Sequence, residues 1–450
     1  MKRDSSDFER PFASNSTDTA ETKVSQREMP PAQAAVAEKP VRKFSLKTFN
    51  SLRYRDYRLL WFSNLFTSAG MWMEQIAFSW LVYDMTGSAF MLGAINGLRA
   101  LPFLFFGPIA GVVADRVNRK TLMLGSQIYV FVVTTFVTAL IFGNSAGVFK
   151  MEVWHLFFIS FFSSIGWSFT QPVRQALVPN LVPREEMVNA VALQSAGFNS
   201  TRVLGPAAAG IIIAWVGPGG AFAAKALAYI VIIALIAMMK VPPTPANARQ
   251  HSMGHNLVEG FRYIGSNQIA LSLIVLALIP MLLAMPFQTL MPVFARDILG
   301  MGPKGYGLLI SFAGIGALTG TLIVASLGGF RRKGVLLLSS VTILGVFLIL
   351  FSRSTWLPAS LFFMIFIGGF QMTYMSLNNT LLHLNITDDM RGRVMSIYML
   401  DSGLTPLGSL FAGGMASFFG APFAVTFMGA SCIVLAAIAM MRVPIVRRLS

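Results

Sequence analysis

The chain has 450 residues, of which 55% are hydrophobic and only 12% are charged. A soluble domain carries roughly 25% charged residues, so this composition argues against a soluble enzyme and favours a protein whose solvent is the lipid bilayer. The formal net charge of +16 does not indicate a nucleic-acid partner, because the basic residues lie in a tail and in short loops on one side of the apolar segments. A single cysteine excludes an intrachain disulfide framework.

The first 42 residues differ in composition from the rest of the chain. Residues 1–42 are rich in Ser, Thr, Ala, Gln, Pro and charged side chains, so they bury too little apolar surface to fold, and we expect a disordered cytoplasmic tail. From Lys43, the residues Leu46, Phe49 and Leu52 recur at helical spacing among basic residues. This pattern is typical of a short helix on the inner membrane surface, and a solvated, fraying tail is an equal alternative.

Twelve apolar segments follow the tail, most of them close to or above the length of about 20 residues that spans a bilayer as a helix. They lie at 57–84, 89–114, 120–143, 152–178, 188–216, 219–241, 270–296, 304–327, 333–352, 356–382, 391–418 and 421–442. One long polar break around 242–269 contains a proline cluster and cannot lie in lipid. We therefore expect an all-α integral membrane protein with a six-helix half at 43–241, a cytoplasmic linker at 242–269 and a six-helix half at 270–450.

The distribution of Lys and Arg predicts the orientation of these segments. If the N-terminus is cytoplasmic, the tails and loops on that side hold 27 Lys and Arg residues and those on the opposite side hold four. The bias remains fifteen to four without the N-terminal tail. Cytoplasmic loops of membrane proteins carry the excess of positive charge, so both termini are expected to be cytoplasmic.

The two halves resemble one another in sequence. Shifts of 203 and 213 residues place several residues of the first half on identical residues of the second. Examples are Met187 with Met390 and Gly210 with Gly413 at the first shift, and Gly107 with Gly320 at the second. Each half has six crossings, so the repeat preserves membrane sidedness, as in transporters that are built from two parallel six-helix halves.

A charged loop between the second and third segments carries the strongest motif. The sequence GVVADRVNRK matches every fixed position of G-x-x-x-D-R-x-x-R-K, and it resembles the loop 2–3 signature of the major facilitator superfamily. Positive-inside charge alone accounts for Arg119 and Lys120 but not for Gly111 or Asp115. The resemblance implies that Gly111, Asp115, Arg116, Arg119 and Lys120 belong to a lock between the halves on the cytoplasmic side.

The second half has only part of this loop motif. Its copy, LGGFRRKG, keeps the basic cluster but has Gly328 and Gly329 where the first half has Asp115 and Arg116. The resemblance therefore implies an asymmetric lock, with the acidic member in the first half alone.

A second motif lies in the fifth segment. The sequence RVLGPAAAG, from Arg202 to Gly210, resembles the antiporter signature of the superfamily, whose core is G-P-x-x-G-G. Gly205, Pro206 and Gly210 match this core, whereas Ala209 replaces a glycine. The superfamily carries the signature in drug/proton antiporters. An ordinary run of small residues for close helix packing is the alternative interpretation.

Longer stretches, such as QPVRQALVPNLVPREEMVNAVALQSAGFN, resemble the bacterial branch of the superfamily that exports siderophores and drugs. This resemblance implies a monomeric, multi-pass secondary transporter of the bacterial inner membrane, which exports a small amphipathic molecule against protons by alternating access. It implies no cofactor, metal or nucleic-acid partner. An importer or symporter of a small metabolite is the alternative within transport. A membrane enzyme or receptor is disfavoured because the sequence shows no catalytic constellation.

Several charged and amide residues lie inside the apolar segments, where a charge is expensive and marks a cavity or a partner. Glu74 and Asp401 are the candidates for a proton-carrying carboxylate, with a static ion pair as the alternative for each. Polar residues expected to line a substrate cavity are Gln75, Arg99, Arg202 and Gln288.

Two further cations are expected to have structural roles. Arg174, near the cytoplasmic end of the fourth segment, is predicted to pair with Glu185 or Glu186 in the following loop. Lys225, in the outer part of the sixth segment, is predicted to extend its ammonium group outward to the membrane surface.

Overall fold

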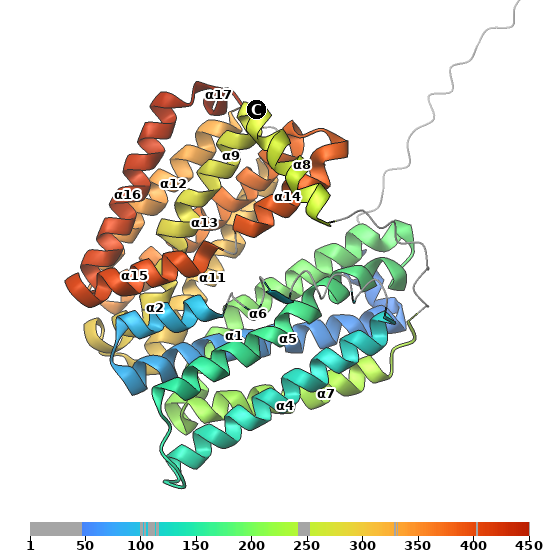
Figure 1. The fold of residues 1–450 in the computed structure, drawn as a ribbon, viewed down its shortest axis with the longest axis vertical. Helices are drawn as coiled ribbons and strands as arrows, with labels where there is room; N and C mark the ends of the chain where they lie inside the picture. The colour runs from blue at the N-terminus through green and yellow to red at the C-terminus, as the bar shows by residue number, and fades with distance from the viewer. Residues whose placement is uncertain are drawn as a thin grey trace, which may run out of the picture. The chain divides into compact units, whose positions relative to one another are not determined.

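The computed structural model describes residues 47–99, 102, 105–106, 113, 117–241, 253–327, 330, 332–401 and 404–449. Within these residues the chain forms helices and connecting turns, and no β-strand is present. Figure 1 shows that the helices of the first half lie together in one group and most of those of the second half in another. The expected tail at 1–42 lies outside the described residues.

The first half contains six apolar helical segments, as the sequence predicts. Its elements are η1 (Lys47–Arg53), α1 (Arg55–Thr86), α2 (Ala89–Leu98), α4 (Arg119–Ser145), α5 (Val153–Leu181), η2 (Arg184–Glu186), α6 (Met187–Val216) and α7 (Pro218–Ala237). Helix α1 ends at Gly87, whose φ of 59° is left-handed and suits glycine. Helix α4 begins after Asn118, whose side chain accepts a hydrogen bond from the Lys120 backbone amide at 2.9 Å.

The second half follows the same plan. Its longer elements are α8 (Met253–Ser266), α9 (Gln268–Ile279), α11 (Gly302–Ser326), α12 (Lys333–Ser352), α13 (Leu357–Asn385), α14 (Asp388–Asp401), α15 (Thr405–Phe419), α16 (Ala421–Arg442) and the short α17 (Pro444–Arg447). The polar break expected at 242–269 therefore contains a helix, α8. An ion pair between Glu259 and Arg393, at 2.6 Å, holds α8 against α14.

The seventh apolar segment is helical but irregular. After α9 it continues through π-helical and 3₁₀ turns at η3 (Pro280–Ala284) and η4 (Met285–Leu290), the single turn α10 (Met291–Val293) and η5 (Phe294–Ile298). Pro280, Pro286 and Pro292 recur every six residues within this stretch. Each proline lacks the amide that a regular helix needs, so the hydrogen-bond pattern shifts at each of them.

Eight helices of the described part are long and apolar enough to cross a membrane. The remaining predicted segments correspond to α1, to the apolar α2, to α6 and to the consecutive helices α14 and α15. Every one of the twelve predicted segments thus corresponds to a helical part of the described chain.

Short polar contacts tie together the end of the first half at which α1, α4 and α6 begin, which we call the basic end. The Lys120 ammonium donates to the Ala237 carbonyl at 2.7 Å, and the Lys240 amide donates to Asp56 at 2.9 Å. In η1, the Ser51 hydroxyl donates to the side chain of Asn189 at 2.7 Å. The described part of the expected surface helix is thus one short 3₁₀ helix, held to the start of α6.

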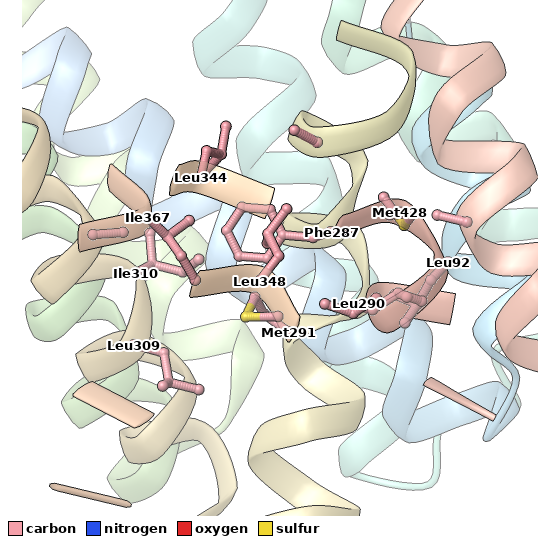
Figure 2. Packing of buried hydrophobic residues seen from close by; sticks show 14 of the residues in the cluster. Leu92, Phe287, Leu290, Met291, Leu309, Ile310, Leu344, Leu348, Ile367 and Met428 are labelled. Carbon is pink, nitrogen blue, oxygen red and sulfur yellow. The ribbon is translucent and has the colours of Figure 1, made fainter. Parts of the chain in front are cut away.

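The largest apolar core lies mainly in the second half. Figure 2 shows Phe287 and Met291 of the irregular segment close to Leu348 of α12, with Ile367 of α13 nearby. Leu92, from α2 of the first half, belongs to the same buried cluster. The core is therefore continuous across the two halves at this depth.

Close backbone packing joins the halves along two helix pairs, α6 with α11 and α2 with α15. A Cβ atom on Gly210 would lie 2.7 Å from the Pro303 carbonyl oxygen. A Cβ on Gly307 would lie 2.5 Å from the Pro206 carbonyl oxygen, and one on Gly413 would lie 2.5 Å from that of Ala89. Only glycine allows this approach, as in small-residue interfaces of membrane helices. These contacts lie toward the far end, opposite the basic end.

Candidate functional site

A carboxylate and two cations form a buried cluster inside the first half. Glu74, from the middle of α1, accepts a hydrogen bond from the Lys225 ammonium of α7 at 2.6 Å. The Arg99 guanidinium, directly after α2, lies 3.5 Å from the other Glu74 oxygen. The side chains of Glu74 and Lys225 are 10% and 4% exposed. A buried charge is costly unless it is paired, so Glu74 and Lys225 depend on each other, whereas the Arg99 side chain is 25% exposed and partly solvated.

Gly70 makes room for this cluster. It lies one helical turn before Glu74 and therefore on the same face of α1. A Cβ atom on Gly70 would lie 3.1 Å from Lys225 Cγ, so the aliphatic stem of Lys225 crosses α1 at this glycine and reaches Glu74. The expectation that Lys225 extends outward to the membrane surface is wrong, because its flexible stem reaches an internal carboxylate instead.

A cavity of about 440 Å³ lies between α1, α5 and α6, and Met372 of α13 contributes to it from the second half. Its volume falls within the range of ligand pockets, roughly 300–1,000 Å³. The polar residues among its lining are Asn64, Ser68, Arg174, Gln194, Ser195 and Asn199. Met187, at the start of α6, also lines it, so the cavity extends toward the basic end.

Trp61 forms a fixed wall of this cavity. Its indole Nε1 donates to the Leu193 carbonyl oxygen at 2.9 Å. A Cβ atom on Gly197 would lie 3.4 Å from the same indole nitrogen, so the ring lies against the backbone of α6. The aromatic ring is therefore held in one orientation beside the polar residues of the cavity.

Arg174 reaches the same cavity from α5. Its residue surface is 6% exposed, and its Nε and Nη2 atoms have no hydrogen-bond partner within the described part of the chain. The predicted pairing with Glu185 or Glu186 is wrong. The Glu186 carboxylate instead accepts a hydrogen bond from the Asn50 side chain, and η2 contains no buried residue.

The far end of the protein is closed by side chains as well as by glycines. The Tyr83 hydroxyl of α1 donates a hydrogen bond to the Asp297 carboxylate of η5. Next to it, Arg296 lies 3.3 Å from Asp84. Both contacts join the two halves. Cross-half contacts thus close the far end, whereas the cavity extends toward the basic end.

The motif of the fifth segment lies where α6 packs against α1 and α11. The Arg202 guanidinium carbon lies 6.0 Å from the centre of the Trp72 ring. A Cβ on Gly314 would lie 3.0 Å from the Arg202 carbonyl oxygen, and one on Gly205 would lie 2.9 Å from Trp72 Cβ. The glycines of this motif therefore serve close helix packing, and Arg202 lies beside an aromatic ring near the interface of the halves.

The other predicted site residues are dispersed. Gln75 and Gln288 are both half-buried, on α1 and in η4, and neither belongs to the lining of the 440 Å³ cavity. Asp401 is the last residue of α14, and its side chain lies outside the description. The structure therefore brings Glu74 and Arg99 together, and neither glutamine lines the cavity.

The loop motif is described only in part. Arg119 and Lys120 begin α4, and Lys120 binds the end of α7. Gly111, Asp115 and Arg116 lie outside the described residues.

Sequence reasoning missed Asn64, Ser68 and Gln194 as cavity residues. A signal for the first two was present, since Trp61, Asn64 and Ser68 recur at helical spacing on one face of an apolar segment. Polar residues that share one face of a membrane helix indicate a cavity on that face. Gln194 had no comparable signal.

Comparison with known proteins supports the same fold and a transport role. A family profile described as transmembrane secretion effector matches residues 46–449. The staphyloferrin A transporter of Staphylococcus aureus is 27% identical over 376 residues, which cover 81% of this chain and 90% of that protein. Macrolide efflux protein A of Streptococcus pyogenes is 25% identical over 362 residues, which cover 77% and 86% of the two chains.

Among solved structures, a bacterial homologue of the human lysosomal transporter Spinster, in an inward-facing and unoccupied conformation, matches with a TM-score of 0.68. The match covers 88% of this chain and 99% of that one at 16% sequence identity. This similarity confirms the predicted all-α, twelve-helix membrane fold.

Proposed function

The chain belongs to the transmembrane secretion effector family of the major facilitator superfamily, and from this premise we propose that it exports a small amphipathic molecule in exchange for protons. It acts as a monomer in a bacterial cytoplasmic membrane, with both termini inside the cell. Residues 43–241 and 270–450 are the two halves that rock about the substrate, and residues 242–269 link them. No catalytic conversion of the substrate is part of this proposal.

The arrangement of the cavity carries the proposal. The 440 Å³ cavity extends toward the basic end, while Tyr83, Asp297 and the glycine contacts join the halves at the far end. With the basic end in the cytoplasm, this is the inward-facing state, from which an exporter loads its cargo. The names of two relatives, a staphyloferrin A transporter and a macrolide efflux protein, support a small-molecule cargo, and the second name supports export.

We assign the coupling proton to Glu74, with Asp401 as the second candidate. Glu74 is the acidic residue that the described part of the structure buries in the membrane segments. When the carboxylate is ionised, it holds Lys225 and Arg99 and thereby ties α1 to α7 and to the end of α2. Protonation of Glu74 removes the negative charge that pairs with Lys225 and Arg99. The packing of α1 against α7 and α2 therefore changes, and α1 lines the cavity.

We further propose that Gly111, Asp115, Arg116, Arg119 and Lys120 lock the halves at the basic end in the opposite, outward-facing state. Lys120 is already anchored to the end of α7, which supports a fixed position for the basic side of this lock. Arg202, Pro206 and Gly210 contribute the surface on which α6 packs against α11, and Gly205 packs against Trp72 of α1.

Transport by the purified full-length protein in proteoliposomes tests the proposal. The vesicles would be loaded with staphyloferrin A, the cargo that the name of one relative gives, and a pH gradient would be imposed across the membrane. Flux that the gradient drives and a protonophore abolishes is the expected result. Flux that ignores the gradient, or flux in the direction of the proton movement, would contradict proton-coupled export and favour uniport or import.

The variant Glu74→Gln separates the two carboxylates. It mimics a permanently protonated side chain, so pH-driven export should be lost while downhill exchange of substrate persists. Retained pH-driven export would remove Glu74 as the proton carrier and transfer the assignment to Asp401. Asp388→Asn, which changes an exposed carboxylate at the start of α14, serves as the matched control.

A further inference from the structure

The cavity has an electrostatic character that goes beyond the general proposal of amphipathic cargo. Arg174 is the charged residue among its described lining, which includes no Asp or Glu. The remaining polar lining consists of amides and hydroxyls, and the other residues are apolar or aromatic. The cavity therefore presents one positive charge in an otherwise uncharged, partly aromatic container.

Arg174 forms no ion pair within the described part of the protein. Two other cations of the first half, Lys225 and Arg99, share the one buried carboxylate, Glu74. Arg174 interacts electrostatically with Tyr229, but a phenol does not neutralise a guanidinium. Its Nε and Nη2 groups stay unpartnered at 6% exposure. A buried and unpaired cation is strongly unfavourable unless a ligand supplies the missing anion.

The groups around Arg174 fit the rest of such a ligand. Asn64 is 6% exposed, and both atoms of its amide are unpartnered. The carbonyl oxygen of the Gln194 side chain is also unpartnered. Trp61 is held in place by its bond to Leu193 and offers a flat apolar surface. The cavity thus combines a guanidinium for an oxyanion, amides for neutral polar groups and an aromatic wall.

We propose that this cavity selects carboxylate-bearing amphipathic molecules and that Arg174 binds the carboxylate, an inference that rests on the proposed transport function. The planar guanidinium matches a carboxylate with two parallel hydrogen bonds. Asn64 and Gln194 hydrogen-bond to hydroxyl or amide groups of the same molecule, and its apolar part lies against Trp61. Cationic amphiphiles are disfavoured because their charge would face Arg174.

Binding to the purified full-length protein in detergent tests this proposal without any gradient. The probes are 2-naphthoate, its methyl ester, 2-naphthyl phosphate and 2-naphthyl-trimethylammonium, measured by calorimetry. We expect naphthoate to bind best and Arg174→Gln to weaken it at least tenfold, with Arg174→Lys between the two. The methyl ester should bind weakly, and its affinity should be the same for the wild type and for Arg174→Gln. Asn64→Leu should weaken naphthoate severalfold.

Asn378→Leu is the matched control. Asn378 is, like Asn64, a buried asparagine with both amide atoms unpartnered within the described residues, but it lies in α13 and does not line the cavity. Its replacement should leave naphthoate binding unchanged. Equal binding of naphthoate to the wild type and Arg174→Gln, no binding to the wild type, or preferred binding of the ammonium compound would overturn the proposal. Tighter binding of the phosphate would overturn the carboxylate assignment.

The melting temperature of the unliganded protein distinguishes recognition from a structural role. Arg174→Met removes an unpaired buried charge, so its melting temperature should equal or exceed that of the wild type. A clear fall would show that Arg174 supports the fold and would contradict the proposal. Failure of pH-driven export with intact, Arg174-dependent naphthoate binding would instead refute proton coupling alone.

Discussion

The two halves of the protein share a sequence repeat and a helical plan, but they bury different chemistry. The first half buries the charged side chains of Glu74, Arg174 and Lys225. In the described part of the second half, the buried polar residues are uncharged, as at Gln371 and Asn378. The repeat has therefore preserved the path of the backbone, while the charges that the proposed coupling and recognition need are concentrated in the first half.

The two halves also meet in different ways at their two ends. At the far end the contact is between backbones, at Gly210 with Gly307 and at Gly93 with Gly413. Toward the basic end, the cavity lies between helices of the first half, and Met372 is the second-half residue that lines it. A contact made by glycines is intolerant of any added atom, whereas a cavity tolerates many side chains. Substitutions of the far-end glycines should therefore disturb helix packing more than substitutions at the cavity wall.

The largest effect on stability is expected from breaking the charged cluster of the first half. Lys225→Met removes the cation nearest to the buried Glu74 carboxylate, and loss of one partner of a buried pair costs about 3–5 kcal/mol. The double variant Glu74→Gln/Lys225→Met also neutralises the stranded carboxylate and should recover part of that loss. Melting temperatures of the wild type, both single variants and the double variant measure the coupling. Wild-type stability of Lys225→Met would show that the cluster does not hold these helices.

The next largest effect is expected at a pair of adjacent glycines in α15 of the second half. A Cβ at Gly413 would lie 2.5 Å from the Ala89 carbonyl oxygen, whereas at Gly414 nothing lies within 4 Å. Gly413→Val should therefore disfavour the closed far end by about 1–3 kcal/mol, as overpacking does, and should slow export. Gly414→Val is the matched control and should transport normally. Equal export rates for the two variants would show that this backbone contact is unimportant to the transport cycle.

An intermediate effect is expected at the loop in which the two halves differ in sequence. Asp115 in the first half corresponds to a glycine in the second-half copy. Asp115→Asn should leave expression and melting temperature unchanged but impair export, because it removes the acidic member of the proposed lock. Export is measured in proteoliposomes at matched protein density. Full export by this variant would remove Asp115 from the mechanism.

The smallest effect is expected at the side chains that join the halves at the far end. Tyr83→Phe removes the hydrogen bond to Asp297, which is worth about 1 kcal/mol. The neighbouring Arg296–Asp84 pair is 44% and 55% exposed and should contribute less. A double-mutant cycle of Tyr83→Phe and Asp297→Asn on melting temperature measures the coupling between the halves. Strict additivity of the two changes would show that the hydrogen bond contributes nothing.

The sequence determined the helices and their order, because apolar length, proline and glycine positions and charge bias act locally along the chain. It predicted that the seventh segment crosses the membrane but not that Pro280, Pro286 and Pro292 divide it into π-helical and 3₁₀ turns. It also pointed to Glu74 as a residue that needs a partner. The loop and fifth-segment motifs indicated the superfamily before any contact was known.

Only the tertiary structure decided which charges meet. Glu74 and Lys225 are 151 residues apart, and hydropathy says nothing of how two helices are rotated toward one another. For the same reason, the sequence-based predictions for Lys225 and Arg174 were wrong. The sequence shows which opposite charge is nearest along the chain, but not which one is nearest in space. Packing between α1, α5, α6 and α7 placed Lys225 on Glu74 and left Arg174 facing the cavity.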